Sequence, residues 1–332
     1  MAEISVIIAT YNRMELLPRT LAALAGQQAE GVDYEILFVD DGSNDRSRKM
    51  IEAEARRSAG RIRYLYLPHS GSPSRPRNFG IREATGKVVL FLDDDVIPDR
   101  DLILQHWEFH RSNPGREYAG LGELFLPLDA KNDPMSLFHS FPYDEVRRRD
   151  RLDYLFFWTC NLSLKREFML EHGLFDEDPT LHPLEDMECG YRLFAHGLQL
   201  KFLPSARGAH VHKMNPAAVP EKGQRTGRAQ FALSGKVPDV ALKHRFRILS
   251  SDLSTSAYVY RLIRRALASV IDNSLTLALL RVLAEGPRRN RVTDMYYFLI
   301  FRRNVVAGYA AAKKEFQGSP AHSEGDVSEC ER

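Results

Sequence analysis

The 332-residue sequence contains 46 lysine and arginine residues against 44 aspartate and glutamate residues, and 44% of its residues are hydrophobic. This length and composition allow a sizeable buried core and favour either one large domain with an appendage or two domains. The net charge of +2 is too balanced for a typical nucleic-acid-binding protein, so nucleic acid is not expected as a partner. Three widely separated cysteines without a CxxC pair indicate neither a disulfide framework nor a zinc knuckle.

The N-terminal stretch MAEISVIIATYNR lacks the basic and apolar regions of a secretory signal. No apolar run approaches the ~20 residues that are needed to span a bilayer. We therefore expect a cytoplasmic protein that is either soluble or bound peripherally at the inner face of the membrane.

The first hundred residues alternate short apolar runs with amphipathic helical patterns. The apolar runs are ISVIIA, YEILFVD, IRYLYLP and VVLFLD. This alternation is typical of βαβ units, so we expect an α/β fold with a mostly parallel central sheet flanked by helices. From about Asp99 the pattern becomes mixed, with a helix through LILQHWEFH, a strand through AGLGELFLP and a helix through MECGYRLFAHG.

The same patterns divide the chain into four parts. Residues 1–216 form the first domain, in which 1–98 would bind a nucleotide and 99–216 would shape the pocket of a second substrate. Residues 217–239 are rich in Gly, Pro, Gln and Arg and predict a linker or a mobile loop. Residues 240–316 predict a helical C-terminal region, and residues 317–332 lack apolar periodicity and predict a disordered tail.

The most informative stretch is VVLFLDDDV, in which a buried strand leads into Asp93, Asp94 and Asp95. Two unit charges about 4 Å apart repel by roughly 4 kcal/mol at an effective dielectric near 20, so positive charge is expected beside them. Two carboxylates in a D-x-D spacing can hold Mg²⁺ or Mn²⁺, which then bridges substrate phosphates. A helix cap or a solvated acidic turn is the alternative for the same three residues.

Other polar residues follow the neighbouring strands, where ligands of such sheets bind. Asp41 follows the second strand, Arg77 begins a helix that suits an anion, and His210 in HVH ends a late strand where it could be a third metal ligand. The alternatives without a ligand are a helix cap for Asp41, a surface arginine for Arg77 and a structural histidine for His210. The sequence has neither the GxGxxG turn of a dinucleotide site nor a P-loop.

Taken together, these segments resemble glycosyltransferase family 2, whose members have the GT-A fold and use nucleotide sugars. The resemblance covers roughly residues 3–213 and rests on SVIIATYNR, YEILFVDDGSND, PRNFGIREATGKVVLFLDDDVIP, CNLSLKREFMLEHGLFDED and LEDMECGYRLFAHG. It implies that Asp93, Asp95 and His210 bind the metal and that Asp186 is the catalytic base. It also implies a nucleotide site formed by Thr10, Tyr11, Arg13, Asp41, Arg77, Asp93 and Asp94.

Three residues of the second half are candidates for acceptor binding: Trp158, Asn161 and Glu185. Trp158 could offer an apolar face to a sugar ring, and core packing is its alternative. The chain departs from the family pattern at Pro76, where a small residue usually precedes the Arg-Asn pair.

The sequence therefore predicts an inverting, metal-dependent glycosyltransferase that moves a sugar from a UDP-sugar to a hydroxyl of a glycan, a lipid-linked or a small-molecule acceptor. A sugar nucleotidyltransferase and a non-catalytic nucleotide-sugar-binding protein are the alternatives. Between Lys243 and Glu315 there are 14 basic and 5 acidic residues. This excess suggests docking to a partner protomer or to anionic lipid, with helices that only cover the first domain as the alternative.

Overall fold

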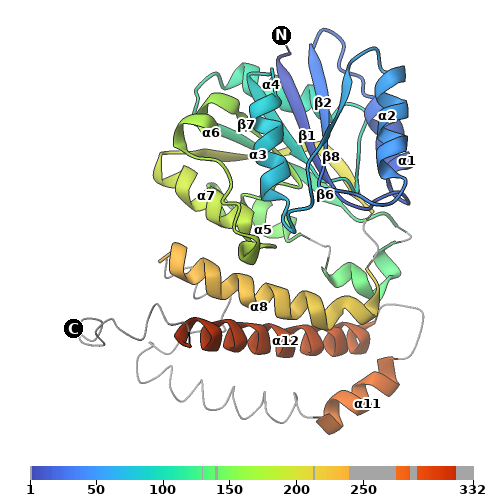
Figure 1. The fold of residues 1–332 in the computed structure, drawn as a ribbon, viewed down its shortest axis with the longest axis vertical. Coiled ribbons are helices and arrows are strands. Elements are labelled where there is room, and N and C mark those ends of the chain that lie inside the picture. The colour runs from blue at the N-terminus through green and yellow to red at the C-terminus, as the bar shows by residue number, and fades with distance from the viewer. Residues whose placement is uncertain are drawn as a thin grey trace, which may run out of the picture. The chain divides into compact units, whose positions relative to one another are not determined.

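The computed structural model describes residues 2–128, 130–138, 141–211, 214–238, 274–284 and 290–318. They fall into two compact units (Figure 1). The first unit comprises Met1–Pro179 and Glu185–Met214, and the second comprises Thr180–Leu184 and Asn215–Arg332.

The first unit is built on one eight-stranded sheet with the order β3-β2-β1-β4-β7-β6-β8-β5. Strands β1 to β4 are mutually parallel, as the sequence predicted, whereas β7 runs antiparallel to both β4 and β6. The sheet is therefore mixed, with β1 to β4 as its parallel half. The strands are β1 (Ile4–Thr10), β2 (Tyr34–Asp40), β3 (Ile62–Tyr66), β4 (Val88–Leu92), β5 (Val96–Pro98), β6 (Tyr118–Phe125), β7 (Asn161–Lys165) and β8 (Gln199–His210).

Helices cover the sheet, and its central strands are therefore buried along almost their whole length. Helix α3 packs on β1 and β2 and lies in front of the sheet in Figure 1. Helix α3 lies so close to β1 that a Cβ added to Gly80 would be only 2.6 Å from the Cγ2 of Ile7. The helices of this unit are α1 (Leu17–Ala25), α2 (Ser47–Arg57), α3 (Ser74–Glu83), α4 (Leu102–Ser112), α5 (Tyr143–Arg147), α6 (Arg166–His172) and α7 (Glu185–Ala195).

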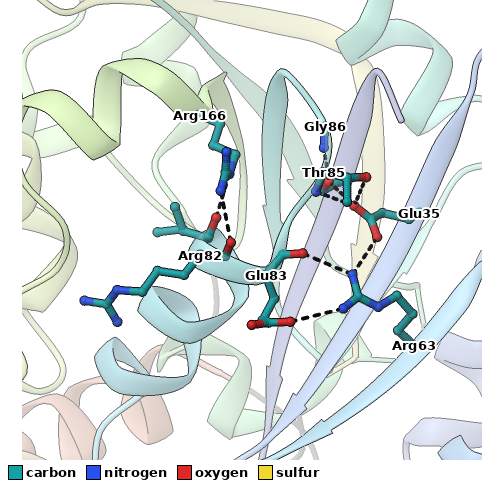
Figure 2. Close-up of polar contacts among 9 residues, drawn as sticks. Glu35, Arg63, Arg82, Glu83, Thr85, Gly86 and Arg166 are labelled. Atoms are coloured by element: carbon teal, nitrogen blue, oxygen red, sulfur yellow. Dashed lines mark hydrogen bonds and ion pairs between the residues drawn. The ribbon is translucent and has the colours of Figure 1, made fainter. Parts of the chain in front are cut away.

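A buried carboxylate holds the edge of the sheet at which β1 and β2 begin (Figure 2). Glu35 on β2 accepts hydrogen bonds from Ser5 on β1 and from both the backbone and the hydroxyl of Thr85, which precedes β4. Arg63 on β3 completes the cluster by pairing with Glu35 and Glu83. This cluster thus links the parallel strands near their amino ends, opposite the edge at which their carboxyl ends meet.

The second unit contains helices α8 (Val219–Lys236), α11 (Ser274–Ala284) and α12 (Arg291–Gln317). Helices α8 and α12 lie side by side in Figure 1. Their backbones come close at Gly223, Gly227 and Gly308, where an added Cβ would meet the carbonyl oxygen of Phe301, Val305 or Gln224 at 2.0 to 2.7 Å. The segment 217–239 was expected to be a linker or mobile loop, but the structure shows a packed helix there because its glycines serve a helix contact.

Helices α11 and α12 agree with the helical region expected over residues 240–316. Residues 240–273 and 285–289 of that expected region, and most of the tail 317–332, lie outside the described residues. None of the described helices combines the length and the apolar character needed to cross a membrane.

Candidate active site

The candidate site forms at the edge where β2, β1 and β4 end. These neighbouring strands are parallel, so the residues that follow them meet at one edge of the sheet. Thr10 ends β1, Asp41 follows β2, and Asp93 to Asp95 follow β4. The structure therefore brings together the strand-end residues that the sequence singled out.

On the β1 and β2 side, Asp41 holds the loop that follows β3. Its buried carboxylate accepts hydrogen bonds from the backbone and hydroxyl of Ser70 and lies 2.8 Å from the Nδ1 of His69. The His69 ring stacks on the half-exposed Tyr11, with ring centroids 4.0 Å apart. Tyr11 and His69 thus present a planar surface that suits a nucleobase.

His69 and Ser70 were not among the residues that the sequence predicted for the site. A signal was present, because the polar run HSGSPS directly follows β3, whose carboxyl end lies at the same edge.

Arg13 contacts the acidic cluster that Asp93, Asp94 and Asp95 form after β4. Its Nε lies 3.1 Å from Asp94 and its Nη2 lies 3.7 Å from Asp95. Burial raises the pKa of Asp94 to about 7; the guanidinium of Arg13 opposes this shift and the charge of Asp95 adds to it. Arg13 was expected in the nucleotide site, and in the structure its guanidinium contacts the carboxylates of Asp94 and Asp95.

Arg77, in the first half of α3, joins the end of β4 to the start of α7. Its buried guanidinium lies 2.9 Å from Glu185 and 3.3 Å from Asp93. Burial opposes the charge, but the carboxylates of Glu185, Asp93 and Asp186 outweigh it and raise the pKa of Arg77. Arg77 is therefore a permanent cation at the centre of the site.

Asp186 lies in the first turn of α7, where the helix dipole favours an anion. Its Oδ1 accepts a hydrogen bond of 2.8 Å from the backbone of Met187. Burial and the neighbouring Glu185 raise the pKa of Asp186 to about 8, although Arg77 opposes the shift. A carboxyl group with such a pKa can exchange a proton near neutral pH.

His210 ends β8 and lies beside the acidic cluster, with its Nε2 3.3 Å from Asp95. No group of three or more His, Cys, Asp or Glu side chains among the described residues is placed to hold a metal ion. A cation that takes most of its ligands from a diphosphate and water needs only one or two protein carboxylates, so Asp95 with His210 fits Mg²⁺ or Mn²⁺.

The residues expected to bind an acceptor are all buried. Trp158 packs against Phe141, Tyr143 and Phe156. Glu185 is occupied by Arg77, and Asn161 is fully buried, with its amide bound to the carbonyl of Ala206.

Comparison with known proteins identifies the family. The model of glycosyl transferase family 2 matches residues 5–170. Validoxylamine A glucosyltransferase from Streptomyces hygroscopicus subsp. jinggangensis is 33% identical over 223 residues, which cover 59% of this chain and 52% of that protein. The glycosyltransferase YfnE of Bacillus subtilis is 24% identical over 261 residues, which cover 64% of this chain and 65% of that protein. The chain thus spans about half of the length of the Streptomyces relative.

Solved structures share the fold. A mannosyltransferase from Pyrobaculum calidifontis, solved with GDP-mannose and Mn²⁺, superposes with a TM-score of 0.63 at 15% identity over 95% of this chain and 88% of that one. Residues 1–349 of Staphylococcus aureus TarS, solved with UDP, superpose with a TM-score of 0.52 at 18% identity over 96% and 92%. The GT-A fold expected from the motifs is confirmed, and the chain belongs to glycosyl transferase family 2.

Proposed function

We propose that this chain is an inverting glycosyltransferase that moves a sugar from a nucleoside diphosphate donor to an acceptor hydroxyl with the help of Mg²⁺ or Mn²⁺. The observation that carries the proposal is the cluster at Arg77. This buried cation joins Asp93, at the carboxyl end of β4, to Glu185, and Asp186 is the next residue in α7. These contacts support a donor at the strand ends with Asp186 beside it as the base.

The donor would bind with its base at Tyr11 and His69 and its diphosphate toward Arg77. The stacked rings supply an apolar plane, and the guanidinium supplies charge for the diphosphate. We favour UDP as the nucleotide, in line with the TarS fragment that was solved with UDP, and GDP is the competitor because the mannosyltransferase was solved with GDP-mannose.

Asp95 and His210 would hold the divalent cation, with Asp93 as a further ligand once its carboxylate turns from Arg77. His210 lies against Asp95, and Asp93 already faces the cation Arg77. When bound, Mg²⁺ or Mn²⁺ supplies Lewis-acid stabilisation of the charge on the departing diphosphate.

Asp186 would take the proton of the acceptor hydroxyl as the hydroxyl oxygen attacks the anomeric carbon from the face opposite the diphosphate. One base suffices for this single displacement, which inverts the anomeric configuration. The amide of Met187 fixes the direction of the Asp186 carboxylate, and the helix dipole stabilises its ionised form.

The acceptor would be a glycan, a lipid-linked sugar or a small molecule. Names of relatives include both a small-molecule acceptor, validoxylamine A, and a polymer, poly(ribitol-phosphate). We also propose that the C-terminal helices dock to a partner protomer or to anionic lipid and that the protein resides in the cytoplasm.

A donor screen tests the function. The full chain is heated with UDP-glucose, UDP-N-acetylglucosamine, UDP-galactose or GDP-mannose, each with Mn²⁺, with Mg²⁺ or with EDTA. A ligand at 100 times its Kd stabilises a protein by about 2.7 kcal/mol, which raises the unfolding temperature. We expect one donor to stabilise the chain with metal only, and Asp95→Ala to remove that stabilisation.

Turnover then separates a transferase from a binding protein. The selected donor is incubated with an acceptor panel, and released nucleoside diphosphate is measured. Acceptor-dependent release supports the proposal. Binding without release under any acceptor, or donor binding that survives EDTA and Asp95→Ala, contradicts it.

A further inference from the structure

A buried chain of hydrogen bonds runs from helix α4 into strand β7. The Nε2 of His110 lies 2.9 Å from the hydroxyl of Ser163, which lies 2.7 Å from the Nδ1 of His106. The Nε2 of His106 in turn lies 2.9 Å from the Oδ1 of Asn161. All four side chains are buried, and His106, Ser163 and Asn161 have no exposed surface.

Chemistry fixes the direction of every proton in this chain. The amide nitrogen of Asn161 donates to the carbonyl oxygen of Ala206 at 2.9 Å, so its Oδ1 must accept from the Nε2–H of His106. Burial lowers the pKa of His106 to about 4, which keeps the ring neutral and makes its Nδ1 an acceptor for Ser163. The Ser163 oxygen then accepts from the Nε2–H of His110.

The Asn161 amide lies at an irregularity between β6 and β8. Gly122 pairs with Leu203 and the next residue, Glu123, pairs with Arg207, so residues 204–206 of β8 form a bulge. Asn161 spans this bulge, since its nitrogen lies 2.9 Å from the carbonyl of Ala206 and 3.5 Å from that of Glu123. A Cβ on Gly122 would lie 2.2 Å from the same nitrogen, so a glycine is required there.

The bulge determines where β8 delivers its last residue. Immediately after it, Gly208, Ala209 and His210 pair with β5, and His210 is opposite Val96. That register places the Nε2 of His210 3.3 Å from Asp95. Without the bulge, β8 would reach this point in a different register, and His210 would no longer face Asp95.

We propose that Asn161, oriented by the Nε2–H of His106, is a positioning residue that aims His210 at Asp95. Asn161 has no exposed surface and acts through the bulge. The inference rests on the proposed function, because it assigns His210 to the cation site. It replaces the expected contact of Asn161 with the acceptor.

Three variants test the proposal through Mn²⁺ affinity, measured by electron paramagnetic resonance of free Mn²⁺ with UDP present. His106→Leu removes the donor to Asn161, whereas His106→Gln retains an amide nitrogen near the position of the imidazole Nε2. We expect His106→Leu to weaken Mn²⁺ binding about tenfold, in line with the loss of an outer-shell partner, and His106→Gln to stay within threefold of the parent. His210→Ala is the positive control and should weaken binding at least as much.

The outcomes separate the two proposals. If His210→Ala weakens Mn²⁺ binding and His106→Leu does not, the positioning role is refuted while the cation site stands. If His106→Gln and His106→Leu lose affinity equally, the specific donor is not what matters, and the inference also fails. If His210→Ala binds Mn²⁺ like the parent, the cation site in the proposed function is wrong.

A measurement on the unaltered protein needs neither metal nor a variant that must fold. Nitrogen-15 spectra of labelled histidines should show His106 neutral, with its proton on Nε2, throughout pH 6 to 8. A proton on Nδ1, or a charged ring at pH 6, would overturn the assigned chain.

Discussion

The sharpest prediction concerns Asp186→Asn. Asparagine keeps the oxygen that accepts from the Met187 amide, and it removes the charge that Glu185 repels, so the free energy of unfolding should not fall. Transfer should slow by a factor on the order of 10² to 10⁴, the usual contribution of a positioned general base. That factor corresponds to about 2.7 to 5.5 kcal/mol of transition-state stabilisation.

The assay compares kcat for transfer, donor affinity and the unfolding midpoint of parent and variant. Glu185→Gln is the neighbouring control. Its carboxylate contacts Arg77, so Glu185→Gln should change the KM of the donor more than it changes kcat at the top of the pH profile. A variant with asparagine at position 186 that transfers within a few-fold of the parent rate would make Asp186 a helix cap and refute the reasoning.

The dependence on pH gives a second readout of the same residue. A base acts in its ionised form, and the pKa of Asp186 is raised to about 8 by burial and by Glu185. The parent rate should therefore increase as pH rises through neutrality toward about 8, and Asp186→Asn should flatten this rise. Glu185→Gln should shift the rise to lower pH, because it removes the repelling charge.

Two further predictions concern stability, measured by chemical unfolding. Glu35→Ala leaves the buried Ser5 hydroxyl and the Thr85 amide without their acceptor, so it should lower the free energy of unfolding by about 3 kcal/mol. A loss below about 1 kcal/mol would contradict the stabilising role of the Glu35 cluster in Figure 2. Gly227→Ala forces a Cβ to 2.0 Å from the Val305 oxygen and should destabilise the α8–α12 pair by about 1 to 3 kcal/mol. Gly235→Ala, in the same helix with nothing within 4 Å, should be neutral or slightly stabilising, and equal effects of the two changes would refute the packing argument.

The parallel half of the sheet could be predicted from the sequence because its signals are local. Runs such as VVLFL are continuous and apolar, and their carboxyl ends converge by topology alone. The direction of long side chains could not be predicted this way. Arg13 lies in a strand-end motif, but whether it faces a nucleotide or Asp94 depends on the fold around it.

The segment 217–239 shows the opposite failure, in which a sound local rule gives the wrong structure. Gly223 and Gly227 lower helix propensity and suggested a loop. In the folded chain their lack of a side chain lets α8 approach α12, and the contact offsets the local cost. Only the distant partner sequence of α12, with Gly308 in the same interface, distinguishes the two cases.

The charge balance of the site depends on the acidic residues that follow β4. Five carboxyl groups gather there: Asp93, Asp94, Asp95, Glu185 and Asp186. Two arginines, Arg13 and Arg77, contact four of the five and offset part of their charge. The excess is visible in the raised pKa of Asp94, about 7, and of Asp186, about 8, because burial and neighbouring carboxylates favour the protonated forms. Fixed side chains thus leave negative charge that protons or an added cation can balance, and a divalent ion suits that deficit.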